Sequence, residues 1–119
     1  MAKSLLIICR QAPWSGPGAR EALDIALAGG AFDLPIAMLF LDDGVFQLQP
    51  GQHAAPVQQK DLTANLQALP LFGVDALYSS VRSLEERGLL HQALSPATET
   101  LNDAALTALL GQYDQVITL

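Results

Sequence analysis

An unbroken apolar run over residues 36–41 constrains the fold of this chain more than any other stretch. A run of this length without polar alternation is typical of a strand buried on both faces, as in a parallel sheet covered by helices. Residues 42–44, Asp-Asp-Gly, follow directly, and we expect the chain to turn there with Gly44 at positive φ. Residues 5–9 form a second run of the same kind. We therefore predict that these two runs are central strands of one sheet.

Helical and extended patterns alternate along the rest of the chain. Residues 19–28 have apolar side chains at helical spacing, and Gly29 and Gly30 are expected to end that helix. The other predicted elements, in chain order, are a helix over 57–69, a strand over 75–81, a helical turn over 83–87, a short strand within 92–98, a helix over 100–110 with a capping box at Thr100 and Asp103, and a strand over 114–119. This alternation predicts an α/β domain in which helices cover both faces of a mostly parallel, five-stranded sheet.

Length and composition limit the functions to be considered. The 119 residues are expected to form one domain, residues 1–119, with a single core. Half of the residues are hydrophobic and only 15% are charged, which suggests apolar surface that is buried against another chain. The net charge is −6 and the basic residues are scattered, so we do not expect this chain alone to bind nucleic acid or an anionic membrane.

Cysteine content and hydropathy indicate the compartment. A single cysteine, Cys9, excludes an internal disulfide and a cysteine-rich metal site. No apolar stretch reaches the 18 residues of a transmembrane helix, and the N-terminal apolar run is too short for a signal peptide. We therefore expect a cytoplasmic protein.

Two features have both a chemical and a structural interpretation. Cys9 could be a nucleophile if its sulfur were accessible, with Arg10 lowering its pKa, but a buried small hydrophobe at the end of an apolar strand is favoured. The turn Gly16-Pro17-Gly18 could hold a phosphate at a helix N-terminus, but a plain tight turn is favoured. The turn lacks the P-loop pattern, because no Lys-Ser/Thr pair follows it.

The remaining candidates for chemistry are weaker. Asp42 and Asp43 could be a carboxylate pair, but neighbouring strand residues point to opposite faces, so turn formation is favoured. His53 and His91 have no second ligand at metal spacing, and surface imidazoles are expected. Trp14 could stack on a ligand, cover the core edge or meet a partner. We predict no catalytic, metal or cofactor site.

The residues that follow the turn are candidates for a partner interface. Ligands and partners usually meet an open α/β sheet at the carboxyl ends of its strands. Phe46, Gln47 and Leu48 lie just past such an end, and Trp14 follows the other apolar run. We expect at least Phe46 to be buried against another chain, with a place in this chain's own core as the alternative.

Residues 42–52, DDGVFQLQPGQ, resemble the segment after the second strand in the DsrE/DsrF-like sulfur-relay family, in its TusC-type, DsrF-like branch. The Ala12-Pro13 loop, the stretch SLEERG over 83–88 and Tyr113-Asp114 agree with that branch, and the resemblance covers essentially the whole chain. It implies a three-layer α/β/α, flavodoxin-like domain. It also implies assembly with TusB-like and TusD-like chains, two copies of each chain being expected.

The resemblance further implies what such a complex does. In this family the complex passes persulfide sulfur from a TusA-like donor to a TusE-like acceptor, and the sulfur ends in the 2-thio group of the wobble uridine of certain tRNAs. The sulfur-carrying cysteine of TusD-like relatives lies eight residues before the glycine that corresponds to Gly88, and that position is Ser80 in this chain. A serine hydroxyl cannot form a persulfide, and Cys9 lies on a different strand.

Two hypotheses about function follow. The first is a non-catalytic subunit that holds a sulfur-carrying partner in a TusBCD-like complex. The second is a stand-alone thiol enzyme or a small-ligand-binding α/β domain that uses Cys9 or the turn over residues 16–18. Fast alkylation of Cys9 in the native protein would favour the second hypothesis.

Overall fold

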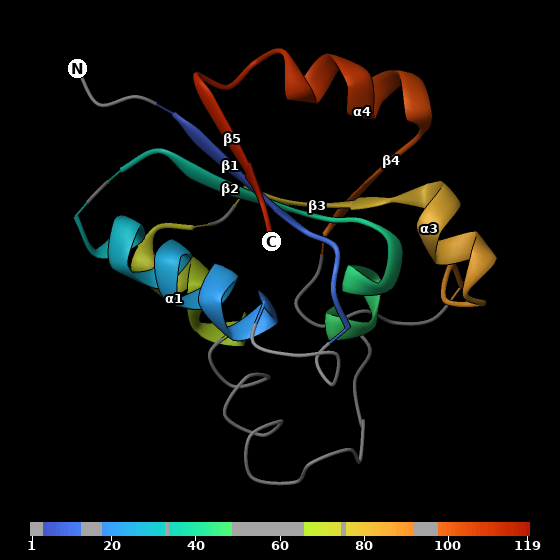
Figure 1. The fold of residues 1–119 in the computed structure, drawn as a ribbon, viewed down its shortest axis with the longest axis horizontal. Coiled ribbons are helices and arrows are strands. Elements are labelled where there is room, and N and C mark those ends of the chain that lie inside the picture. The colour runs from blue at the N-terminus through green and yellow to red at the C-terminus, as the bar shows by residue number, and fades with distance from the viewer. Residues whose placement is uncertain (1–3, 13–17, 33, 49–65, 75, 92–97) are drawn as a thin grey trace, which may run out of the picture.

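The computed structural model describes residues 4–12, 18–32, 34–48, 66–74, 76–91 and 98–119, and in this part of the chain five strands form a single sheet (Figure 1). Every neighbouring pair of strands is parallel, in the order β4-β3-β2-β1-β5. Both apolar runs are internal strands, which confirms their predicted central position. The strands are β1 Leu5–Cys9, β2 Ile36–Phe40, β3 Ala76–Ser80, β4 Glu99–Leu101 and β5 Gln115–Thr118.

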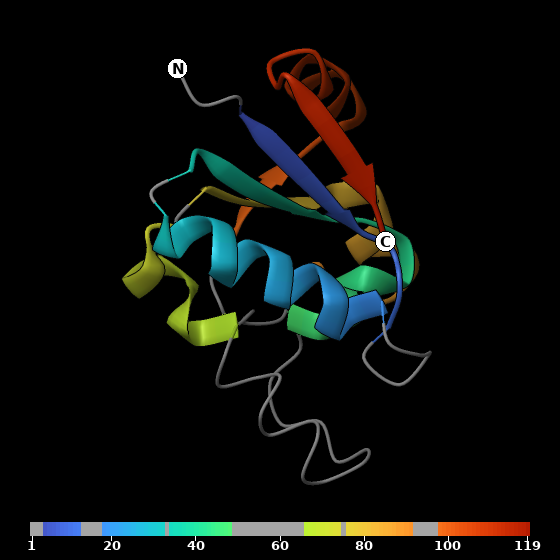
Figure 2. The same ribbon diagram turned by 60° about the vertical axis from the view of Figure 1, so that its left-hand side comes forward.

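Helices lie on both faces of this sheet, so the α/β/α class is confirmed. Helix α1 lies on one face together with two 3-10 helices, η1 and η2, whereas α4 lies on the other face (Figures 1 and 2). Helix α3 begins directly where β3 ends, at the carboxyl edge of the sheet. The bounds are α1 Gly18–Ala31, η1 Asp42–Leu48, η2 Leu69–Phe72, α3 Val81–Glu86 and α4 Asp103–Leu110.

The core has two unequal parts, one on each face of the sheet. Side chains alternate between faces along a strand, so in β1 Leu6 contributes to the α4 side and Ile7 to the α1 side. The α1 side is the larger part and includes Met38 and Phe40 of β2. Because both faces are covered, a strand in the middle of the sheet has no solvent-facing side, which accounts for its unbroken apolar sequence.

Helix α1 continues through Gly29 and Gly30, so the prediction that these glycines end the helix is wrong. Both are buried inside it. A Cβ atom on Gly29 would lie 1.9 Å from the Cδ1 atom of Ile36, and one on Gly30 would lie 2.4 Å from the carbonyl oxygen of Phe72. The two glycines therefore allow β2 and η2 to pack closely against the helix, and this close packing outweighs their low helix propensity.

The boundary between β4 and α4 also differs from the prediction. Thr100 lies in β4, where it pairs with Ser79 of β3, and α4 starts only at Asp103. The cap is Asn102, whose Oδ1 atom accepts a hydrogen bond from the backbone N–H of Ala105 at 2.8 Å. The predicted helix over 100–110 thus began too early, and the capping box was misplaced.

Two other predicted elements fall largely outside the described residues. These are the strand within 92–98 and most of the helix over 57–69, of which residues 66–68 are described and are helical. Within the described ranges, no helix has the length and apolar character needed to cross a membrane.

Candidate functional site at the carboxyl edge of the sheet

The carboxyl ends of β1, β2 and β3 bring three positions singled out in the sequence to one edge of the sheet. Cys9 is the last residue of β1, Ser80 the last of β3, and Asp42 begins η1 just after β2. The edge is held together by the backbone, since the N–H of Leu41 donates to the carbonyl oxygen of Cys9 at 3.0 Å. This edge is where an α/β sheet usually meets its ligands.

Ser80 occupies a structural position at this edge. It is buried, and its hydroxyl oxygen accepts a hydrogen bond from the backbone N–H of Ser83 at 3.2 Å, which caps α3. The Ser83 hydroxyl in turn accepts from the backbone N–H of Asp42 at 2.9 Å. Beside them, the Ser79 and Thr98 hydroxyl oxygens are 2.7 Å apart. The hydroxyls of Ser80 and Ser83 thus connect β3, α3 and η1, and the Ser79–Thr98 contact connects β3 to the residue before β4.

The thiol of Cys9 is enclosed by the core. The residue is only 1% exposed and belongs to the apolar cluster on the α1 side. Burial raises its pKa from the ordinary value of 9.0 to about 12, because the thiolate would lose its hydration. The Arg10 side chain is paired with Asp42, with Nε at 2.8 Å from Oδ2. The interpretation of Cys9 as a buried small hydrophobe is confirmed.

The two aspartates after β2 are each paired with an arginine from another element. Asp42 pairs with Arg10 of the chain following β1, and Asp43 Oδ1 lies 3.0 Å from the Nε atom of Arg87, just past α3. Arg87 also donates from a terminal guanidinium nitrogen to the carbonyl oxygen of Ser83 at 3.2 Å. The aspartates thus stabilise the turn, as favoured from the sequence, and tie it to two neighbouring elements.

The backbone conformation of this turn differs from the one expected. The residue with positive φ is Asp42, at 50°, and Gly44 is not in that region. Aspartate is one of the residue types that tolerate this conformation. Gly44 is needed for another reason: a Cβ atom there would lie 1.8 Å from the carbonyl oxygen of Cys9. The expected role of Gly44 was therefore wrong, because close approach of two backbones, not positive φ, requires glycine.

The side chains of η1 divide between the core and the surface. Residues three apart lie on the same side of a 3-10 helix, and Val45 and Leu48 both point into the α1-side core with no exposed surface. Gln47 is also buried: its Nε2 atom donates to the carbonyl oxygen of Gln11 at 2.9 Å, and its Oε1 atom has no partner. Phe46 is half-buried and packs against the same core.

The burial of these side chains determines which of the predicted interface residues a partner could reach. Leu48 has no exposed surface and contributes to this chain's own core, so it is not available to a partner. Phe46 is partly exposed in the isolated chain. Trp14 lies outside the described residues. Among the candidate interface residues that the structure describes, Phe46 is therefore the one that is not buried.

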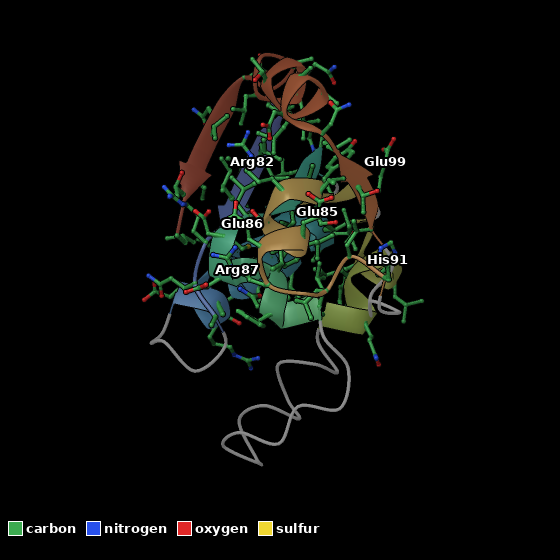
Figure 3. All side chains as sticks on the ribbon, turned by 90° about the vertical axis from the view of Figure 1, so that its right-hand side faces the viewer. Arg82, Glu85, Glu86, Arg87, His91 and Glu99 are labelled. Carbon is green, nitrogen blue, oxygen red and sulfur yellow. The ribbon has the colours of Figure 1, made fainter. Side chains whose placement is uncertain are left out.

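Charged side chains of α3 lie at this edge, among them Arg82, Glu85 and Glu86 (Figure 3). Arg82 pairs with Asp103 at the start of α4, whereas Glu85 and Glu86 are exposed. His91 is exposed, as expected for a surface imidazole. No group of histidine, cysteine, aspartate and glutamate that could hold a metal ion occurs among the described residues. Neither Ser83 nor Arg87 was expected from the sequence to have a role, although their i, i+4 spacing within the predicted helical turn over 83–87 was a signal that their side chains lie near each other.

An all-parallel sheet in the order β4-β3-β2-β1-β5, with α1 and α4 on opposite faces, defines a three-layer α/β domain. The sequence profile of the DsrE/DsrF-like family matches residues 3–119, and the chain belongs to this family. It is 73% identical, over all 119 residues of both chains, to a Pseudomonas aeruginosa protein named "Protein TusC homolog". The crystal structure of the ychN protein from E. coli superposes with a TM-score of 0.77 over the full length of both chains at 19% identity, which supports the fold.

Proposed function

We propose that this chain is a non-catalytic subunit of a TusBCD-like sulfur-relay complex in the cytoplasm. The complex passes persulfide sulfur towards 2-thiolation of the tRNA wobble uridine. Full-length similarity to a protein named TusC homolog supports this assignment. The direct partners are TusB-like and TusD-like chains, with two copies of each chain, and a TusA-like donor and a TusE-like acceptor act before and after the complex.

The observation that supports the non-catalytic role best is the state of the chain's only thiol. Cys9 is 1% exposed and burial raises its pKa to about 12, so at neutral pH it is a protonated thiol without access to a sulfur donor. At the position of the family's sulfur-carrying cysteine, Ser80 caps α3. Neither residue offers a nucleophilic sulfur, so in this proposal the persulfide is held by a partner.

The same observation weakens the alternative of a stand-alone thiol enzyme. A nucleophilic cysteine needs a lowered pKa and an open approach, and Cys9 has neither. The alternative ligand site at residues 16–18 falls mostly outside the described residues, and Gly18 is the first residue of α1.

We further propose that the exposed part of Phe46 belongs to the partner interface. The ring is carried by η1, which is fixed on one side by Val45 and Leu48 in the core and on the other by the Arg87–Asp43 pair. A half-buried aromatic on a fixed element is a suitable anchor for a partner, because little conformational entropy remains to be lost on binding. In the complex, this surface lies beside the edge that contains Ser80.

Labelled sulfur tests the proposal directly. The chain is co-expressed with its TusB-like and TusD-like partners, and the purified complex is loaded with radioactive sulfur from the TusA-like donor and separated without reductant. We expect the label on a partner chain and none on this chain, with the Cys9→Ala complex loaded to the same extent. Persulfide label on Cys9 of the native complex would overturn the non-catalytic role, and failure of the three chains to associate would overturn the assignment to this complex.

A further inference from the structure

Strand β5 is an edge of the sheet without the features by which proteins normally prevent edge-to-edge pairing. Its residues, Gln115–Thr118, include no charged residue and no proline, and all four are in register with β1, so the strand has no bulge. Val116 is 41% exposed, and Thr118 is exposed as well. Charged side chains, proline and bulges are the usual protection of an edge strand. Their absence leaves β5 open to pairing with a further strand.

The opposite edge of the sheet is protected. Strand β4, Glu99–Leu101, is shorter and begins with a charged residue, Glu99, which is exposed. A charge on an edge strand disfavours pairing because it would have to be desolvated. In Figures 2 and 3, β5 lies along one side of the molecule, and none of the described helices covers its outer side. Pairing at β5 therefore meets neither a charge on the strand nor a covering helix of the described chain.

The backbone groups of Val116 and Thr118 point away from β1. The N–H groups of Gln115 and Leu119 donate towards the chain of β1, at 3.1 and 2.9 Å. Neighbouring residues of a strand direct their N–H and C=O groups to opposite sides, so residues 116 and 118 direct theirs outward. In the described chain, β5 is the last strand on this side of the sheet. Two residues of β5 thus present hydrogen-bonding groups at the edge.

We infer that β5 pairs with β5 of a second copy of this chain, antiparallel and about a two-fold axis, so that two sheets become one. This inference does not rest on the proposed function, because it concerns this chain alone. In an antiparallel ladder, facing residues of a hydrogen-bonded pair exchange both of their N–H···O bonds. Pairing Val116 with Thr118 of the second copy uses all the outward backbone groups of β5, gives about four hydrogen bonds and places the axis at Ile117.

The distribution of charge favours a second copy as the occupant. About a two-fold axis each side chain lies near its own copy, so a charged surface would meet its own sign. Residues 104–119 contain one charged residue, Asp114, whereas the whole chain contains 12 acidic and 6 basic residues. Asp114 precedes the paired residues, and its carboxylate accepts from the N–H and the hydroxyl of Ser4 at 2.8 and 3.1 Å. In this register no charged side chain is therefore opposite its own kind.

The side chains of β5 suit this pairing. Three of the four are β-branched, the type that gains most from a neighbouring strand. Ile117 is half-buried at the border of the α1-side core, and its Cβ atom would lie roughly 5 Å from that of its copy. A strand edge buries less than the roughly 800 Å² per partner of a standard interface. We therefore expect the lone chain to dimerise weakly.

Antiparallel pairing has a consequence for assembly. The strands of the two copies run in opposite directions, so their carboxyl edges lie at opposite ends of the joined sheet. Phe46 and Ser80 of each copy, which lie at that edge, remain away from the contact. Each copy could then bind its own partners at the carboxyl edge while the two copies stay joined through β5.

Disulfide trapping tests the pairing and its register, in the lone chain and in the co-expressed complex. Cys9 is buried, so a cysteine added on β5 supplies the accessible thiol. Ile117→Cys brings two thiols together at the axis, where an oxidant links them. The matched control is Gln115→Cys, which lies on the same side of the strand and is more exposed, but is opposite residue 119 of the second copy. We expect at least about tenfold more linked dimer for Ile117→Cys, because a disulfide requires close Cβ atoms.

A charge exchange at the two outward positions is the second test. Val116→Lys with Thr118→Lys places lysine opposite lysine, whereas Val116→Lys with Thr118→Glu places lysine opposite glutamate at the same positions. Sedimentation equilibrium of the full chain measures dimerisation, and melting temperatures report on folding. We expect the variant with two lysines to dimerise at least about tenfold more weakly than the variant with lysine and glutamate, with similar melting temperatures.

Three results would overturn the inference. The first is equal linking of the two cysteine variants, or no linked dimer from either. The second is equal dimerisation of the two charge variants. The third is a native chain that stays monomeric alone and unlinked in the complex, while the amides of Val116 and Thr118 become protected from hydrogen exchange there. That result would identify a strand of a different chain as the occupant. The proposed function is unaffected by any of these results.

Discussion

Gly44 packs directly against the carbonyl group of Cys9, so closely that a Cβ atom at position 44 would lie 1.8 Å from the Cys9 oxygen. The same oxygen accepts the backbone N–H of Leu41 at 3.0 Å. This contact joins the end of β1 to η1. It sets the position of the turn in which Val45 and Leu48 are buried and Phe46 packs against the same core with part of its surface exposed.

Substitution of Gly44 is expected to be one of the most damaging single changes in the chain. Gly44→Ala places a methyl group where backbone atoms already lie, and backbone cannot move aside as a flexible side chain can. We predict a loss of about 3 kcal/mol in the free energy of unfolding, measured by urea denaturation. Gly111→Ala is the control, because Gly111 has a helical φ of −80° and its Cβ would lie 3.6 Å from the Ala108 oxygen. Equal stability of the two variants would contradict this account of Gly44.

Cys9→Ala should be mild at neutral pH and should change how stability depends on pH. Removing one sulfur from the core is expected to cost on the order of 1 kcal/mol. Burial raises the pKa of the folded thiol from 9.0 to about 12, so its contribution is fully present below pH 9 and is lost as pH rises towards 12. Across that window, the native chain should lose about 1.4 kcal/mol per pH unit relative to Cys9→Ala. Parallel curves from pH 8 to 11 would show that the thiol is not buried.

Ser80→Ala should affect stability and not sulfur transfer. The substitution removes the acceptor for the backbone N–H of Ser83, and loss of such a cap typically costs about 1 kcal/mol. Asn102→Ala removes the corresponding cap of α4 and is expected to cost a similar amount. Thermal unfolding measures both variants. A complex that assembles with Ser80→Ala but no longer transfers sulfur would give Ser80 a chemical role that this account does not allow.

Phe46→Ala tests the proposed interface at the carboxyl edge. The variant should weaken association with the partner chains at least about tenfold, or roughly 1.4 kcal/mol, while the lone chain still folds. Val45→Ala is the matched control, since this neighbour is fully buried and its truncation should lower the melting temperature without changing affinity. If Phe46→Ala instead lowers the melting temperature by many degrees and affinity stays the same, Phe46 belongs to this chain's core.

The sheet could be predicted from the sequence because the burial of a strand can be read from the side chains of that strand alone. The run over residues 5–9 coincides with β1, and the run over 36–41 contains all of β2. Both are apolar at every position because helices cover both faces. The burial of Cys9 followed from the same reasoning, since it ends such a run.

The structure differs from the sequence-based prediction where tertiary packing determines the local conformation or the burial of a side chain. Gly29 and Gly30 resemble a helix end, and only the close approach of Ile36 and Phe72 explains why they lie inside α1. Leu48 resembled a surface residue after a turn, but the 3-10 conformation of η1 places it beside Val45 in the core. The contact between Gly30 and Phe72 joins segments that are distant in the sequence, and Leu48 is buried only because η1 packs against the core. A single sequence shows neither contact.

The central claim is that this chain supports sulfur transfer without carrying the sulfur, and the only cysteine provides the most direct test. Cys9→Ala leaves a chain with no thiol at all. The measurement is the 2-thiouridine content of tRNA from cells in which this variant replaces the native chain, alongside the mass of the intact complex. We predict near-native thiolation with a normally assembled complex. Loss of thiolation in cells where the complex is intact would contradict the claim.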